Sequence, residues 1–305
     1  MGGIGRSMKK NGEKTGQGRE VFARTDLACE AGREIARKSE RRVEVGGVPV
    51  TVTRSREADG GRYVTVACGR IGERGEEDLP ALTELLSEEL VAMATVMLGH
   101  KPSPDDRILV VGLGNADMTP DAVGPGTVRR MTVTRHLRGY DEALFASLGC
   151  CELSALSPGV MGQTGMESAE LVRGAAELIR PDLIVAVDAL AARSCERLAA
   201  TVQLSDGGIG PGAGIGNHRM AIDRDSVGCP VMALGVPTVV DSSTVVWDAL
   251  AEAGVDTEAL PDRLCEVLEQ GRSFIVAPRD ADRMVEMICM WFARALDQAF
   301  GVGGV

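Results

Sequence analysis

Asp182-Leu-Ile-Val-Ala-Val-Asp188 is the stretch that decides the fold, because five consecutive apolar residues stand between two carboxylates. A continuous apolar run of strand length is typical of a strand that is buried on both faces of a sheet. A second such run, Arg107-Ile-Leu-Val-Val-Gly-Leu113, comes earlier in the chain. Helical patterns flank both runs. Apolar strands bounded by helices predict an α/β fold, with a mostly parallel, twisted sheet and helices on both faces.

The pattern outside these two runs predicts the remaining elements. We expect short strands at 63–68, 153–156, 200–204 and 231–236, and helices at 76–98, 122–137, 167–179, 242–253 and 281–300. Val43 to Thr53 alternates apolar and polar residues around Gly46-Gly47, which predicts a small N-terminal β-hairpin region. A glycine-rich loop at 205–217 interrupts the alternation of strands and helices. Loops of this length in compact domains are usually functional, so we expect it to line a substrate cleft.

Composition excludes several classes of protein. The 305 residues have 44% hydrophobic content and a net charge of −11, too apolar for intrinsic disorder and too acidic for a nucleic-acid-binding surface. No apolar run reaches the ~18 residues of a membrane span. The eight cysteines form no C-x-x-C pair, which favours reduced thiols in a cytoplasmic protein. Residues 1–20 are polar and glycine-rich without the apolar core of a secretory signal, so we expect a disordered leader.

Carboxylates near strand ends are the strongest candidates for chemistry. Ligands of α/β sheets bind beyond the carboxyl ends of the strands, where Asp188 ends one buried run and Asp121 follows the other. Asp121 also fits the N-cap of a helix that begins after Pro120. If the two strands are neighbours, both carboxyls face one cleft, where one keeps its proton and the other activates water. This predicts hydrolysis of an amide bond, with Asp241 at the end of a third strand in support.

The alternative is a nucleotide-binding α/β enzyme. Gly112-Leu-Gly-Asn-Ala-Asp117 begins like a dinucleotide fingerprint directly after a strand. Asp117 occupies the place of the third glycine, and a carboxylate there repels a pyrophosphate. No histidine lies in a motif with a serine or cysteine nucleophile, and the three histidines are not spaced as metal partners of the cysteines.

A series of ordered blocks marks the chain from about residue 21 to residue 250. The blocks are Arg24-Thr-Asp-Leu-Ala28, Gly61-Arg-Tyr-Val-Thr65, Val110-Val-Gly-Leu-Gly-Asn115, Thr119-Pro-Asp-Ala-Val-Gly-Pro125, Thr134-Arg-His-Leu137, Pro158-Gly-Val-Met-Gly-Gln-Thr-Gly165, Val187-Asp-Ala-Leu-Ala-Ala-Arg-Ser194, the loop 205–217 and Gly235-Val-Pro-Thr-Val-Val-Asp241. Together they resemble the germination protease family of spore-forming bacteria. This family comprises unusual aspartic-type endopeptidases that degrade small acid-soluble spore proteins.

The resemblance implies roles for particular residues. The family's proposed catalytic pair falls on Asp121 and Asp188, with Asn115, Arg193 and Asp241 in supporting or substrate-binding roles. The pattern also looks like that of hydrogenase-maturation peptidases, whose phosphorylase/hydrolase-like fold the family is thought to share. In those relatives acidic residues and a histidine hold a metal. No histidine stands in an obviously equivalent place here, so we expect no catalytic metal and no cofactor.

The resemblance further implies a zymogen that cuts its own N-terminus. The family's substrates are cut after an acid that is followed by an apolar residue and alanine, and Thr25-Asp-Leu-Ala28 has this form. We therefore expect a cut between Asp26 and Leu27, which divides the chain into a propeptide, 1–26, and a single peptidase domain, 27–305. The expected substrates are small acid-soluble spore proteins in the forespore or spore core. We expect no nucleic-acid or membrane partner, and a homotetramer.

Overall fold

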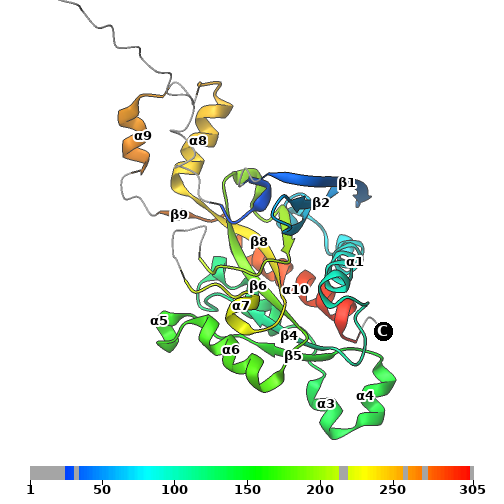
Figure 1. The fold of residues 1–305 in the computed structure, drawn as a ribbon. Helices are drawn as coiled ribbons and strands as arrows, with labels where there is room; N and C mark the ends of the chain where they lie inside the picture. The colour runs from blue at the N-terminus through cyan, green and yellow to red at the C-terminus, as the bar shows by residue number, and fades with distance from the viewer. Residues whose placement is uncertain (1–24, 31–33, 213–218, 257–259, 270–273, 303–305) are drawn as a thin grey trace, which may run out of the picture.

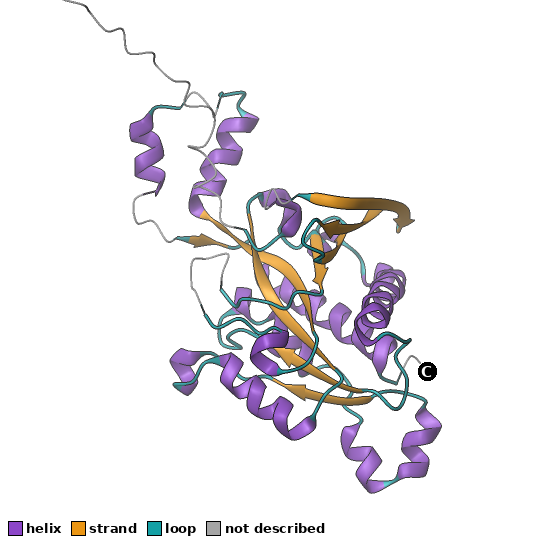
Figure 2. Cartoon of the chain, in the orientation of Figure 1, coloured by secondary structure: helices purple, strands orange, loops and turns teal. Residues whose placement is uncertain are grey.

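The computed structural model describes residues 25–30, 34–212, 219–256, 260–269 and 274–302. A single mixed sheet runs through the middle of the molecule, with helices on both of its sides (Figures 1 and 2). The strands lie in the order β1-β2-β3-β7-β8-β6-β4-β5, and β9 pairs with β8. Their bounds are β1 Ile35–Val45, β2 Val48–Glu57, β3 Arg62–Ala67, β4 Arg107–Gly112, β5 Glu152–Leu156, β6 Leu183–Ala192, β7 Thr201–Ser205, β8 Val231–Asp241 and β9 Ile275–Val276.

Helices occupy most of the segments between the strands. The α-helices are α1 Leu79–Leu98, α2 Val123–Val128, α3 Arg135–Tyr140, α4 Glu142–Leu148, α5 Met161–Thr164, α6 Ser168–Ile179, α7 Arg224–Val227, α8 Ser242–Glu252, α9 Asp262–Glu269 and α10 Ala281–Phe300. Short 3-10 helices are η2 Ala28–Glu30, η3 Ile71–Glu73, η4 Glu76–Asp78, η5 Thr119–Asp121 and η6 Cys195–Arg197. None of the described helices is both long enough and apolar enough to cross a membrane.

The parallel half of the sheet consists of β5, β4, β6 and β8. Successive strand residues point to opposite faces. Val110 and Val185 therefore pack in the layer formed by α1, α2 and α10, whereas Leu109 and Ile184 pack in the layer that contains α6 and α7. Burial on both faces explains why these strands are continuous apolar runs. The prediction of an α/β fold is confirmed.

The other half of the sheet is antiparallel. β7 lies between β8 and β3 and is antiparallel to both, and β2 and β1 complete this edge. The hairpin predicted at Val43 to Thr53 is present, with Gly46 and Gly47 in the left-handed region at φ 59° and 75°. Its strands are much longer than predicted, because most of β1 is exposed and charged and gives no apolar alternation.

One helix was predicted where the structure has two. The segment 122–137 contains α2 and the start of α3, with a break between them. The fully buried Thr134 causes the break: its N–H donates to the carbonyl of Leu153, and its hydroxyl donates to the carbonyl of Cys151. These bonds hold the chain against the start of β5. The helices predicted at 76–98, 167–179, 242–253 and 281–300 are confirmed as α1, α6, α8 and α10, with small differences at their ends.

Candidate active site

Asp188 lies inside β6, on the strand at the centre of the parallel half. β6 continues to Ala192, four residues beyond the predicted end, because Ala189 to Ala192 remain paired with β8. The side chain is buried, with 5% of the residue exposed. Its Oδ1 accepts a hydrogen bond from the N–H of Ala189 at 2.9 Å. The carboxyl is thus held at the strand while the chain continues past it.

Asp121 is placed by the turn that follows β4. Leu113 N–H donates to the carbonyl of Val187 at 2.8 Å, which ties this turn to β6 directly before Asp188. Asp121 Oδ2 accepts from the N–H of Asn115 at 2.7 Å. Gly114 makes room for this arrangement, since its φ is +109° and a Cβ there would lie 2.0 Å from the carbonyl oxygen of Asp121.

A bond from β8 also holds the Asp121 turn. Thr238 is fully buried, and its hydroxyl donates to the carbonyl of Pro120 at 2.7 Å. The turn is therefore fixed by β6 on one side and by β8 on the other. In addition, the Asn115 N–H is used by Asp121, so it is not free to bind a phosphate. This removes a donor that the nucleotide-binding alternative needs.

Both carboxyls open into one cleft of about 330 Å³ at the carboxyl ends of β4, β6 and β8. Its wall is formed by residues of the β4–η5 turn, the α5–α6 region, β6 and β8, together with the loop residues Pro211 and Gly212. The lining includes Asn115, Met118, Asp121, Val160, Met161, Glu167, Asp188, Leu190, Arg219, Met220, Thr238 and Asp26. The glycine-rich loop thus reaches the cleft, as predicted, through its described residues. Residues 213–217 of that loop lie outside the described residues.

The two acids have different electrostatic surroundings. Burial raises the pKa of Asp121 above its usual range, opposed by the hydrogen bond from Asn115. Burial raises the pKa of Asp188 well above its usual range, and the nearby carboxyls of Asp121 and Asp26 raise it further. Burial first, and the neighbouring carboxyls second, make Asp188 the acid of the pair whose protonated form is more strongly favoured. Each carboxyl accepts one backbone N–H, so the deeper burial of Asp188 and its two carboxyl neighbours distinguish it from Asp121.

Thr25 to Ala28 lies across the same region. Asp26 donates its N–H to the carbonyl of Ala191 at 3.0 Å, and its Oδ2 accepts from the Ala191 N–H at 2.9 Å. Leu27 is fully buried in an apolar pocket with Leu190, Leu198 and Val240. The predicted cleavage segment is thus docked at the site. Of the predicted propeptide 1–26, residues 1–24 lie outside the described residues.

The other predicted site residues have different positions. Asn115 lines the cleft, and its side-chain oxygen accepts from Gln163 Nε2 at 3.1 Å. Arg193 has an exposed side chain that is not among the described residues lining the cleft, and its N–H donates to Glu30 at 2.8 Å. Asp241 caps α8, accepting from the N–H of Ser243 at 2.9 Å. Within the described part of the chain, no three His, Cys, Asp or Glu side chains form a group that could hold a metal ion.

Sequence reasoning missed two polar residues. Thr238 fixes the Asp121 turn, and Gln203 binds the segment Asp26–Ala28. Gln203 is buried, with 8% exposed, in the middle of the five-residue strand β7. The available signal was a glutamine in the middle of a short strand, because a buried amide needs hydrogen-bond partners and can therefore mark a binding position.

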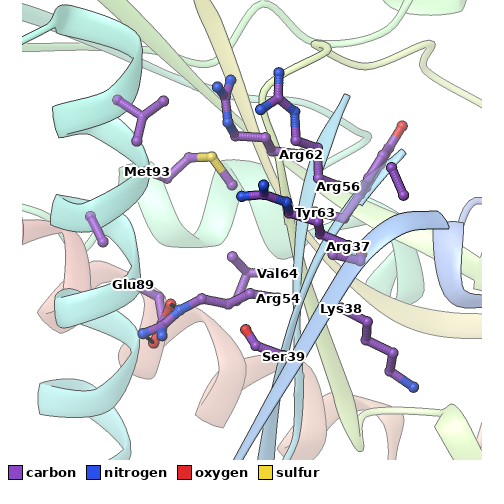
Figure 3. Close-up of a pocket in the computed structure, with 14 residues that line it drawn as sticks. Arg37, Lys38, Ser39, Arg54, Arg56, Arg62, Tyr63, Val64, Glu89 and Met93 are labelled. Carbon is purple, nitrogen blue, oxygen red and sulfur yellow. Dashed lines mark hydrogen bonds and ion pairs between the residues drawn. The ribbon is translucent and has the colours of Figure 1, made fainter. Parts of the chain in front are cut away.

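A second groove, of about 640 Å³, lies between β1–β3 and α1. Arg37, Arg56 and Arg62 are register partners across three neighbouring strands, and Figure 3 shows their side chains around this groove. Among its lining residues the single acid, Glu89, binds Arg54 through both of its oxygens. The groove is basic and lacks the carboxyl pair, so the cleft of Asp121 and Asp188 is the candidate active site.

Comparison with known proteins gives one consistent family. The family model described as germination protease matches residues 17–252. The germination protease of Caldanaerobacter subterraneus subsp. tengcongensis is 33% identical to this chain over 313 residues, covering 92% of this chain and 94% of that protein. The germination protease of Priestia megaterium is 40% identical over 253 residues, covering 76% and 67%. That of Clostridium perfringens strain 13 is 40% identical over 251 residues, covering 74% and 73%.

Proposed function

Because this chain belongs to the germination protease family, we propose that it is an aspartic-type endopeptidase in which Asp121 and Asp188 hydrolyse the peptide bond. The observation that carries this proposal is the shared cleft, in which the buried carboxyl of Asp188 on β6 interacts electrostatically with the half-buried carboxyl of Asp121 in η5. The family itself is one of peptidases that act in spore germination. The shared cleft supports Asp121 and Asp188 as the groups that would act.

The surroundings of the two acids suggest a division of roles. Asp121, whose carboxylate accepts from the Asn115 N–H, takes a proton from water as the water oxygen attacks the carbonyl carbon. Asp188, which favours its proton, gives that proton to the leaving amine nitrogen as the C–N bond breaks. The products are a carboxylate and an amine, and proton exchange with solvent restores both groups. A base with a raised pKa is well matched to proton transfer near neutral pH.

The docked segment supports self-processing between Asp26 and Leu27. Asp26 lines the cleft of Asp121 and Asp188, while Leu27 fills an apolar pocket beyond it. In this arrangement the chain is a zymogen whose propeptide ends at Asp26.

The contacts of the same segment suggest the substrate class. The Ala191 N–H binds the acid before the cut, and Leu190, Leu198 and Val240 surround the apolar residue after it. Proteins that carry an acid, an apolar residue and alanine in sequence fit these contacts. We therefore infer that the substrates are small acid-soluble spore proteins, cleaved in the spore core.

We also propose that the chain assembles as a homotetramer. The support is a group of exposed apolar side chains around the start of α8 and β9, called here the α8–β9 patch. Its members are Val245, Val246, Phe274, Ile275 and Val276, each between 38% and 68% exposed. Copies of the chain that meet through this patch would remove it from water.

Asparagine substitution tests the carboxyl pair. Asp121→Asn and Asp188→Asn should each lower self-cleavage and cleavage of a purified small acid-soluble spore protein by about 10²-fold or more, since each removes an acid–base group. The measurement is intact mass over time for the chain and gel analysis for the substrate. Asp141→Asn, which alters the exposed N-cap of α4, serves as the matched control and should cleave normally. Full activity in either site variant would remove that residue from the mechanism.

A further inference from the structure

Gln203 contacts both sides of the bond that is proposed to be cut. Its Nε2 donates to the carbonyl oxygen of Asp26 at 3.1 Å, and its Oε1 accepts from the N–H of Ala28 at 2.7 Å. The carbonyl of Asp26 is the one that water would attack in the proposed cleavage. One carboxamide thus holds the oxygen of the reacting carbonyl and the amide one residue beyond the leaving nitrogen.

The chemistry of the two partners fixes the orientation of this carboxamide. A carbonyl oxygen accepts and a backbone N–H donates, so the NH₂ group must face Asp26 and the oxygen must face Ala28. The reverse orientation would place two acceptors together and two donors together. Gln203 therefore presents an N–H to the reacting carbonyl.

Strand register places Gln203 in line with Asp188, with one strand, β8, between them. Gly235 of β8 is the register partner of Asp188 on one side and of Gln203 on the other. Adjacent strands are about 4.8 Å apart. Asp188 on β6 and Gln203 on β7 therefore stand on either side of Gly235, which carries no side chain. A Cβ at Gly235 would lie 2.6 Å from the side chain of Leu190, which belongs to the Leu27 pocket. The missing side chain at Gly235 makes room for Leu190, which packs over this position and against Leu27 of the docked segment.

The hydrogen bonds of the buried amide point to a peptide ligand. Both bonds described for the Gln203 side chain go to the segment Asp26–Ala28, and none goes to the surrounding sheet. A buried amide that loses its partners is costly. A second peptide with the same backbone geometry would restore both bonds, whatever its side chains are.

We propose that Gln203 is a further catalytic residue, which stabilises the oxyanion formed when water attacks the carbonyl before the cut. This inference rests on the proposed cleavage after Asp26. As the C–O bond to water forms, the carbonyl electron pair moves onto the oxygen that Gln203 Nε2 faces. When the C–N bond breaks, that pair returns to the carbonyl, and the leaving nitrogen takes its proton from the acid pair. Asp121 and Asp188 transfer the protons, and the Gln203 N–H donates to the oxyanion and stabilises its negative charge.

Two substitutions in the full-length chain test the donor. Gln203→Met keeps the approximate shape and removes both polar groups. Gln203→Glu keeps an acceptor for Ala28 but has no N–H for Asp26. Removing one oxyanion donor typically costs about 10²–10³-fold in rate. We expect both variants to lose self-cleavage by at least about 10²-fold at pH 7, followed by intact mass, with thermal unfolding to verify the fold.

A pH series separates charge stabilisation from a purely structural role. The carboxyl introduced by Gln203→Glu can donate through its O–H once it is protonated. Its titratable neighbours are Asp26 of the docked segment, Asp188 across Gly235 and Tyr63 of β3, which lines the same cavity. Dividing each rate by the wild-type rate at the same pH corrects for titration of the acid pair. The ratio for Gln203→Glu should recover at least about tenfold between pH 7 and pH 5, whereas the ratio for Gln203→Met should stay low.

The outcomes distinguish this inference from the proposed function. A wild-type chain that cuts after Asp26 while a folded Gln203→Met variant cuts within threefold of it would overturn the role of Gln203 alone. The same holds if Gln203→Glu shows no recovery in acid. A wild-type chain that leaves the bond intact would overturn the proposed cut and the role of Gln203 together. Gln203→Asn supplies a second folded variant if Gln203→Met does not fold, and its shortened amide should show the same loss at every pH.

Discussion

At the scale of single residues, the chemistry of the cleft opposes stability. Asp188 is buried near two other carboxyls, and these surroundings penalise its charged form. A group whose pKa is raised by folding favours the native state below its ordinary pKa. That contribution is lost as pH rises through the folded-state value. The native state therefore becomes less stable from about pH 4 towards neutrality because of Asp188.

Asp188→Asn should stabilise the protein at neutral pH while it abolishes cleavage. The amide cannot ionise, so its advantage over Asp188 should grow between pH 4 and pH 7. We expect Tm at pH 7 to rise by at least about 2 °C, since roughly 1 kcal/mol moves Tm by about 2–4 °C in a chain of this size. Calorimetry across pH measures this. The control Asp141→Asn should show no such pH-dependent gain. If the Tm difference between Asp188→Asn and the wild type were the same at pH 4 and pH 7, burial of the charged Asp188 would not carry the proposed cost.

Leu27 gives a second residue-scale prediction. Its side chain is fully buried, and Leu→Ala changes at buried sites cost about 2–5 kcal/mol. Leu27→Ala should therefore loosen the docked segment and slow self-cleavage by at least about tenfold. The rate is measured by intact mass, and limited proteolysis around residue 27 should speed up. Leu144→Ala, on the exposed surface of α4, is the control that should change neither.

Sequence predicted the acid pair for a physical reason that the structure supports. Asp121 and Asp188 reach one cleft because β4 and β6 are parallel neighbours, so that the turn after β4 lies beside Asp188, and apolar runs identify such strands well. Asp241 also stands at the carboxyl end of a strand, β8, but its side chain caps α8 instead of entering the cleft. Gln203 follows Asp188 by 15 residues, but it lies on another strand, β7. Its role depends on β7 running antiparallel between β8 and β3, which local pattern does not reveal.

At the scale of elements, β1–β3 carry a row of like charges. Arg56 stands between its register partners Arg37 and Arg62, and like charges directly opposite each other destabilise a sheet. Asp206 offsets part of this repulsion, because its Oδ2 lies 2.9 Å from Nη1 of Arg62 and forms an ion pair with it. The long exposed β1 and the charged groove could not be predicted from sequence, because exposed strands lack an apolar pattern and register is a tertiary property.

Arg56→Thr should therefore raise stability at low salt. Removing the central charge relieves two repulsive contacts and introduces a residue that favours strands, an effect of about 0.5 kcal/mol. Thermal unfolding in 20 mM and 1 M salt should show the gain at low salt and a smaller gain at high salt. Arg41→Thr is the matched control on β1. It removes an ion pair with Glu88 at 3.3 Å, so it should give no gain at either salt concentration.

At the scale of the whole molecule, the α8–β9 patch lies where β9 pairs with the end of β8 and α8 begins. In Figure 1, α8 and α9 stand at one end of the molecule, while α1 and α10 pack beside the sheet. α8 buries little of its apolar surface, with only Ser243 and Thr244 buried. The proposed homotetramer would explain why an apolar patch persists on an acidic chain.

Phe274→Asp should reduce the assembly to smaller species. Phe274 is 68% exposed, and a carboxylate in an apolar contact between copies would be buried without a partner. Light scattering after size exclusion should show a fall in mass for this variant. Tyr140 belongs to α3, outside the α8–β9 patch, and is 88% exposed. Tyr140→Asp should therefore leave the mass of the assembly unchanged. An unchanged mass for Phe274→Asp would place the contact between copies elsewhere.

The buried position of Leu27 has a consequence for how tightly the processed protein binds substrate. A cut after Asp26 releases the chain before the bond, but Leu27 stays joined through η2 to β1. A tethered group competes at an effective concentration of about the millimolar range for short links. The newly made amino terminus is thus an intramolecular competitor for the pocket that an incoming substrate needs. The processed protein should therefore show a raised apparent KM for substrate, to an extent that does not depend on protein concentration.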